Sequence, residues 1–187
     1  MALPSIAKAT LQSALINAGS NVLAQGIKAY RAEVPFELDV QTLFQFTTCA
    51  FILSPVTFLW LEGLEASFPG EKIVPKENPK DKGNEKEKKE TKLHIPNTIA
   101  KIAIDQLIGG ALSTALYIIT LGTLRGQDYD VITTQLQNDF YPLMIAGFKL
   151  WPLVSILNFT VIPADKRLLV GSLVGVVWAV YLSLLSG

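Results

Sequence analysis

The sequence has one cysteine, Cys49, and one histidine, His94, among 187 residues. A lone cysteine cannot form an internal disulfide, and a metal site would need ligand partners that the sequence does not supply. The formal net charge is zero, so we expect no nucleic-acid partner. No G-x-S-x-G, H-E-x-x-H or glycine-rich phosphate loop is present. We therefore expect no enzyme activity and no cofactor, and we interpret Cys49 as a small buried apolar side chain.

Charge is missing from long stretches of the chain. Residues 9–27, 40–61, 106–124 and 168–187 carry no charge, and residues 140–164 carry only Lys149. A helix of about 20 apolar residues crosses the hydrocarbon core of a bilayer. We therefore predict an all-α fold, a polytopic transmembrane bundle of about four to five membrane helices plus a short amphipathic helix. The chain is expected to be a single transmembrane domain over residues 1–187.

The charge is concentrated instead between residues 71 and 92, which hold eight lysines and six acids. This Lys/Glu-rich stretch has little apolar content, so we predict a mobile polar loop at about residues 69–94. If five segments span, the N-terminus, this loop and the turn before residue 168 lie on one side. Lysine and arginine are concentrated there, which predicts that the loop faces the cytosol, or the matrix of a mitochondrion.

The first apolar segment, residues 5–30, carries a polar stripe. Asn17, Asn21 and Gln25 recur every four residues and therefore share one helical face. Three interpretations are open: pore lining, hydrogen bonding between helices, and a helix lying in the membrane interface.

Two ionisable residues, Asp105 and Lys149, fall inside predicted spans, where charge is costly and commonly functional. Lys101 precedes Asp105 by four residues and could pair with it; Asp105 could equally face a water-filled path. Lys149 has no acid four residues away on its own helix. We hypothesise that Asp105, Lys149 and the polar stripe line one internal cavity. The candidate pore-lining or intramembrane polar residues are Asn17, Asn21, Gln25, Asp105, Gln106, Lys149, Ser155 and Asn158.

Other expectations concern the C-terminal half. Residues 125–139 read as a short surface helix, residues 140–162 as a fourth span and residues 165–185 as a fifth. Gly171 and Gly175 form a G-x-x-x-G pair, which permits close helix contact within one chain or between chains. Trp151 and Trp178 are typical of packing or of anchoring at the membrane interface.

The run LWPLVSILNFTVIPADKRLL, followed by VVWAVYLS, resembles the C-terminal signature of the Mpv-seventeen / twenty-two-kilodalton peroxisomal membrane protein family. The matching residues are Trp151, Pro152, Asn158, Phe159, Pro163, Arg167, Trp178, Tyr181, Leu182 and Ser183. Asp105-Gln106, and Ser54-Pro55 with Trp60, also resemble family motifs. The chain departs from the family at Ser155, where glutamine is frequent, and at Gly109-Gly110, where a proline is usual.

The resemblance implies a small integral membrane protein of peroxisomes or of the mitochondrial inner membrane. Some family members are channel-like, which implies transport of small solutes, so the first hypothesis is a channel or pore for metabolites. The alternative is a non-conducting protein that organises membrane partners. Expected partners are membrane lipids and small solutes, with homo-oligomerisation left open. The N-terminus is only faintly like a mitochondrial transit peptide, because arginine is scarce there. This weak likeness favours the peroxisome slightly over the mitochondrion.

Overall fold

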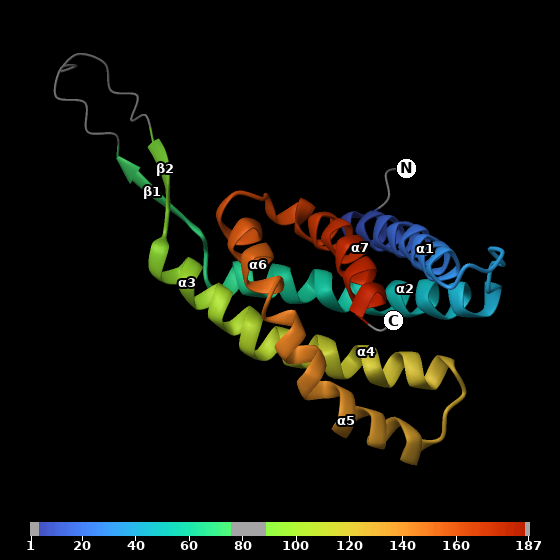
Figure 1. Ribbon diagram of the computed structural model, residues 1–187. Coiled ribbons are helices and arrows are strands. Elements are labelled where there is room, and N and C mark those ends of the chain that lie inside the picture. The colour runs from blue at the N-terminus through green and yellow to red at the C-terminus, as the bar shows by residue number, and fades with distance from the viewer. Residues whose placement is uncertain (1–3, 76–88, 186–187) are drawn as a thin grey trace.

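The computed structural model describes residues 4–75 and 89–185 and is almost entirely helical, which confirms the all-α prediction (Figure 1). The elements follow in the order α1 (Ser5–Arg31), α2 (Val40–Ser67), β1 (Glu71–Pro75), β2 (Lys89–Leu93), α3 (Ile95–Ile104), the π-helix η1 (Asp105–Gly109), α4 (Gly110–Leu124), α5 (Tyr129–Gly147), α6 (Trp151–Thr160), the 3-10 helix η2 (Ala164–Lys166) and α7 (Arg167–Leu185).

Helices α1 and α2 form the first hairpin of the bundle. Asp39 caps α2, because its carboxylate accepts hydrogen bonds from the Thr42 amide at 2.9 Å and the Thr42 hydroxyl at 2.6 Å. The Gln25 side chain joins the two helices, donating to the Asp39 carbonyl at 3.1 Å and accepting from the Asp39 amide at 2.8 Å. The turn is therefore fixed by polar contacts, although both helices were recognisable by apolar length alone.

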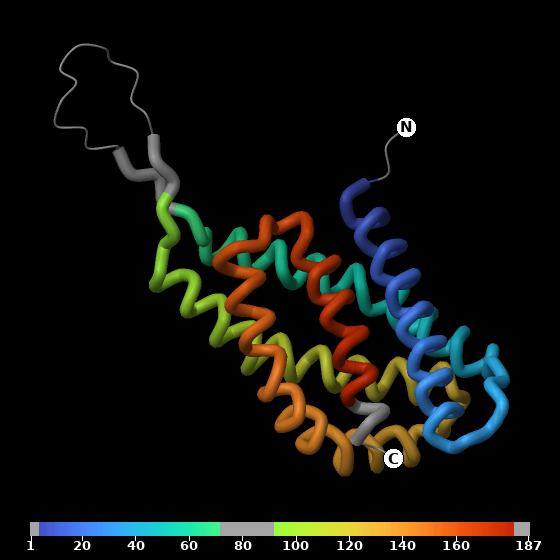
Figure 2. The backbone as a smooth tube through the Cα atoms, turned by 45° about the horizontal axis from the view of Figure 1, so that its top comes forward, coloured from blue at the N-terminus to red at the C-terminus, as the bar shows by residue number. Residues whose placement is uncertain are grey.

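Helix α7 lies between α6 and α1 in both backbone views (Figures 1 and 2). It meets α1 through two small residues, because the Ser172 hydroxyl donates to the Ser13 hydroxyl at 2.9 Å. Ala9 of α1, Phe58 of α2 and Leu168 of α7 form a buried apolar cluster beside this contact. Small side chains let the backbones approach, and the phenyl ring fills the remaining space.

The predicted third span is one continuous helical segment, Ile95–Leu124, in which the π-turn η1 separates α3 from α4. Its end is set by Gly126, which takes a left-handed conformation with φ of 69°. The amide of Gln127 then donates to the Gly122 carbonyl at 3.1 Å, which closes a Schellman-type turn.

Two expectations for residues 125–162 need correction. The predicted surface helix and the first part of the fourth span form a single helix, α5, which retains Pro142 in its interior. The fourth segment instead breaks at residues 148–150, and α5 and α6 meet at an angle of 56°. Pro152 accounts for the break, because its ring lacks an N–H and would clash with the carbonyl four residues earlier if the helix continued.

The polar loop is also more ordered at its ends than expected. Strands β1 and β2 pair in antiparallel register from Glu71 opposite Leu93 to Pro75 opposite Lys89. The remaining part of the predicted mobile loop, 76–88, lies outside the described residues. At the base of the ribbon the His94 amide donates to the Gly70 carbonyl at 2.8 Å. The ribbon projects from one end of the helical bundle (Figure 1).

Within the described residues, two helical segments are long and apolar enough to cross a membrane, Val40–Ser67 and Ile95–Leu124. Taken as one bent span, α5 and α6 add a third. Many large apolar side chains point outwards, among them Phe44 with 69% exposure and Leu107 with 66%. Such exposure suits a lipid environment. The expectation of four to five passes stays a prediction.

Candidate functional site

Asp105 lies at the centre of a polar network where three helical elements meet. Its carboxylate accepts a hydrogen bond from the Trp60 indole of α2 at 3.0 Å and another from the Ser155 hydroxyl of α6. Gln106 donates to the Ser155 hydroxyl at 2.7 Å and more weakly to the carboxylate at 3.4 Å. Three of the predicted site residues, Asp105, Gln106 and Ser155, are thus brought together. Trp60 was noted in the sequence only as part of a family-like motif, not as a site residue.

The π-turn η1 and a glycine create the space for this network. Asp105 is the first residue of η1, a backbone form that recurs at functional sites. A Cβ on Gly109 would lie 2.7 Å from the Trp60 indole nitrogen and 3.1 Å from an Asp105 carboxylate oxygen. Glycine at this position therefore allows the indole to reach the carboxylate. A small pocket of about 40 Å³ between α2 and α4 adjoins Trp60 and Gly109.

A second polar cluster lies nearer the ribbon and is centred on Glu65. Its carboxylate pairs with the Lys101 ammonium at 2.7 Å and with the Arg167 guanidinium at 2.5 Å. It also accepts from the Gly70 amide at 2.8 Å. The Lys101 side chain is fully buried. One carboxylate near the end of α2 thus compensates cations from both α3 and α7.

The Glu65 cluster excludes one of the two interpretations of Asp105, its pairing with Lys101. Lys101 bonds to Glu65, and Asp105 takes uncharged donors instead. Lys101 also does not snorkel to the surface, because it has no exposed area. The predicted topology could have indicated this cluster. If the spans alternate in direction, the end of the second segment lies on the same membrane side as the start of the third and the start of the last. Glu65, Lys101 and Arg167 occupy those three ends.

Arg167 also anchors the turn after Pro163. Its Nε donates to the carbonyl of Asn158 at 2.8 Å and to that of Ile162 at 3.2 Å. The ring of Phe159 lies near both cations, 5.2 Å from the Lys101 nitrogen and 5.0 Å from the Arg167 guanidinium carbon. Both distances are within cation–π range, so Phe159 stabilises the buried charges.

Lys149 and the α1 stripe are not joined to these clusters. Lys149 is exposed in the break between α5 and α6, and it forms no ion pair within the described part of the chain. The Asn17 side chain donates to the Ser13 carbonyl at 2.9 Å, and Gln25 donates to Asn21 at 2.8 Å. The stripe thus bonds within α1 and to the α1–α2 turn. The hypothesis that it shares one cavity with Asp105 and Lys149 stays a prediction.

The aromatic residues of the C-terminal motif pack against one another. Trp151 of α6 meets Trp178 of α7 edge to face with centroids 6.3 Å apart, and Trp178 stacks on Tyr181 at 5.4 Å. Gly147 allows this arrangement, because an added Cβ would lie 3.2 Å from the Trp151 ring. By contrast, a Cβ on Gly171 or Gly175 would meet nothing within 4 Å, so neither glycine marks a close contact within the described part of the chain.

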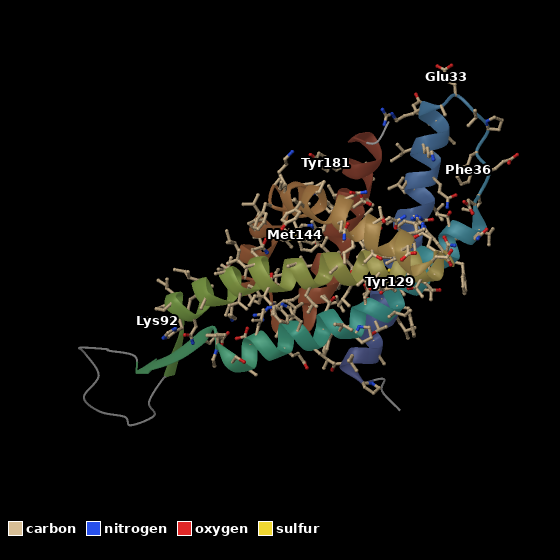
Figure 3. The ribbon with its side chains drawn as sticks, turned by 90° about the horizontal axis from the view of Figure 1, so that it is seen from below. Glu33, Phe36, Lys92, Tyr129, Met144 and Tyr181 are labelled. Atoms are coloured by element: carbon tan, nitrogen blue, oxygen red, sulfur yellow. The ribbon has the colours of Figure 1, made fainter. Side chains whose placement is uncertain are left out.

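One end of the bundle carries the β1–β2 ribbon, and the opposite end carries the α1–α2 turn. Figure 3 shows Lys92 at the ribbon end, and Glu33 and Phe36 at the α1–α2 turn at the other end. The Glu65 cluster belongs to the ribbon end, because Gly70 contacts both Glu65 and the ribbon base. The pKa of Asp39, near the opposite end, lies below its ordinary value because the carboxylate accepts hydrogen bonds from the Thr42 hydroxyl and amide.

Comparison with known proteins supports the resemblance noted in the sequence. Residues 122–183 match the model of the Mpv17 / PMP22 family. Protein SYM1 of Saccharomyces cerevisiae is 30% identical over 90 residues, covering 48% of this chain and 46% of the yeast protein. PXMP2/4 family protein 3 of Dictyostelium discoideum is 27% identical over 176 residues, covering 94% of this chain and 81% of that protein.

A third relative extends over most of both chains. Protein sym1 of Schizosaccharomyces pombe is 24% identical over 199 residues, covering 95% of this chain and 85% of the relative. No solved structure matches. The matched C-terminal region contains α5, α6 and nearly all of α7, and with them the residues of the Trp-Pro and Asn-Phe motifs. The C-terminal part of the chain, residues 122–183, therefore matches the Mpv17 / PMP22 family, and the relatives are consistent with that family.

Proposed function

We propose that this protein is a channel or pore for small solutes in an organelle membrane, peroxisomal or mitochondrial. The observation that supports the proposal is the Asp105 network. It places a carboxylate inside a candidate span, at a π-turn, in contact with Trp60 of a second span and Ser155 of the bent α5–α6 pair. Ionisable side chains at such depth are costly and are retained mostly for function.

The network also suggests how such a pore would be closed. The Asp105 carboxylate is held by side chains from α2 and α6 as well as by its own neighbour Gln106. Opening would require Trp60 or Ser155 to release the carboxylate. The small pocket beside Gly109 gives the indole a space to move towards. Asp105 would then face the solute path, with Ser155 on the opposite wall.

Reconstitution of the full chain into planar bilayers tests the proposal. The wild type is expected to conduct, and Asp105→Asn is expected to change the single-channel conductance, because the amide carries no charge and its single acceptor oxygen cannot accept from both Trp60 and Ser155 as the two carboxylate oxygens do. Asp130→Asn is the matched control, since Asp130 lies exposed in the first turn of α5. Folded wild-type protein that never conducts would overturn the proposal.

A second candidate function, a non-conducting protein that organises membrane partners, is favoured by one feature of the same site. Glu65 bonds to both Lys101 and Arg167, and Asp105 receives donors from both neighbouring elements. Polar faces that bond to each other can serve helix packing alone. Under this alternative Asp105→Asn lowers stability, while neither the variant nor the wild type conducts.

A further inference from the structure

One acceptor in the α3–α6 interface has no donor among the described residues: the side-chain oxygen of Asn158. Asn158 is only 7% exposed. Its main-chain carbonyl is satisfied by Arg167, and Ser155 on the same face of α6 is bonded to Asp105. A buried oxygen without a donor is unfavourable, and such atoms in folded proteins are commonly satisfied by an ordered water.

The position of Asn158 is set by the contacts on either side of it. Ser155 lies against Asp105, and Phe159 lies against Lys101, so α6 runs antiparallel to the segment from α3 into η1. Asn158 follows Ser155 by three residues and precedes Phe159 by one. It therefore lies between the Asp105 network and the Glu65 cluster.

Unused donors lie close to this gap. The Lys101 ammonium has three N–H donors and forms one hydrogen bond within the described part of the chain, to Glu65. Arg167 is also a donor only, and its Nε already donates to the main-chain carbonyl of Asn158. A ligand between these cations and the Asn158 oxygen must accept from one side and donate to the other. Nearby positive charge disfavours a cation, and the amide oxygen disfavours an anion, so the chemistry fits a neutral hydroxyl such as water.

We propose that the Asn158 side-chain oxygen forms a buried water-binding site that joins the Asp105 network to the Glu65 cluster. The water donates one hydrogen to the Asn158 oxygen and the other to the Ser155 hydroxyl, one turn earlier on α6, and it accepts from the Lys101 side of the interface. The two clusters then form one hydrogen-bonded path from the ribbon end to the π-turn. This site does not depend on conduction; if the protein is a pore, the path is its entrance on the ribbon side.

Stability of Asn158→Leu in the full chain gives the first test. Leucine has the same branching and the same number of side-chain heavy atoms as asparagine, is the larger residue, and has no acceptor. If the oxygen is bonded to water, the variant loses that bond and its unfolding midpoint in detergent falls below that of the wild type. If the oxygen is bare, leucine removes an unsatisfied group, and the midpoint stays equal or rises. An equal or higher midpoint overturns the proposal.

Thiol reactivity gives a second measurement should the leucine variant fail to fold. Asn158→Cys and Val154→Cys are compared in a Cys49→Ser background, using methyl methanethiosulfonate, a small neutral probe. Val154 is 5% exposed on the same helix and is the matched control. A hydrated site should make the thiol at 158 react about tenfold faster or more, because a thiol in dry apolar surroundings stays protonated and inert. Equally slow reaction of both thiols overturns the proposal.

Discussion

Replacement of Glu65 by glutamine is the sharpest perturbation of the buried charge cluster. The glutamine side chain keeps the shape of the carboxylate but removes the only anion bonded to Lys101 and Arg167 within the described part of the chain. Lys101 is 0% exposed and Arg167 is 7% exposed, whereas Glu65 itself is 28% exposed. The variant therefore leaves two cations next to each other with little access to solvent.

The expected loss follows from that burial. Removing one partner of a buried ion pair costs about 3–5 kcal/mol. Partial exposure of Glu65 argues for the lower end, so we expect the free energy of unfolding to fall by about 3 kcal/mol. A second change, Lys101→Met on top of Glu65→Gln, removes one of the uncompensated cations. It should restore part of the loss, since only Arg167 then lacks its anion.

The assay is unfolding of the detergent-solubilised protein by sodium dodecyl sulfate, followed by tryptophan fluorescence. Glu62→Gln is the matched control, because Glu62 is an exposed acid one turn earlier on the same helix. Its effect should stay within about 0.5 kcal/mol, as is usual for surface positions. If Glu65→Gln and Glu62→Gln unfold with the same free energy, the ion-pair argument fails.

Three further changes test separate contacts. Gly109→Ala should lower the free energy of unfolding by about 1–3 kcal/mol, because the new methyl group would lie 2.7 Å from the Trp60 indole nitrogen. The same change should shift the fluorescence of Trp60, and an unshifted spectrum would contradict this contact. The lowered pKa of Asp39 means that its capping carboxylate stabilises the fold at pH above its ordinary pKa of about 4, and that this contribution is lost as pH falls through the lower folded pKa. Asp39→Ala should accordingly lower the unfolding midpoint at pH 7 and narrow its difference from the wild type in strong acid, as pH-dependent unfolding would measure. Cysteines replacing Ser13 and Ser172 in an otherwise cysteine-free chain should form a disulfide on mild oxidation, because their hydroxyls are 2.9 Å apart, and a gel without a mobility change would count against this contact of α1 with α7.

Much of the helical layout could be predicted from local sequence. The charge-free runs marked α1, α2 and α7 to within about six residues, and the run 106–124 marked the second part of the segment Ile95–Leu124. Such prediction works because a bilayer-spanning helix satisfies its own backbone, so length and hydropathy suffice. The fourth segment was placed wrongly, because it contains two prolines and sequence alone does not say which one interrupts the helix. Pro142 stays inside α5, and the chain bends before Pro152.

The polar residues of the candidate site could be predicted from the sequence, but their bonding partners could not. Asp105, Gln106, Ser155 and Asn158 were identified as intramembrane polar residues by the rarity of such groups in apolar runs. Their partners were not, because hydrogen bonds and ion pairs between helices depend on how the helix axes pack. Lys101 illustrates the difference: an acid four residues away is its nearest candidate in sequence, yet its carboxylate comes from another helix.

The sequence by itself determined that this protein is helical and apolar along most of its length, and it identified some of the interior polar residues, among them Ser155 and Asn158. Only the tertiary structure decided that Glu65 compensates two cations, that Trp60 and Ser155 hold Asp105, and that the ribbon base is tied to the bundle. The physical reason is the distance along the sequence over which each property is set. Hydropathy and helix formation are properties of neighbouring residues, whereas a buried charge is compensated by whichever donor or acceptor the packed helices bring within about 3 Å.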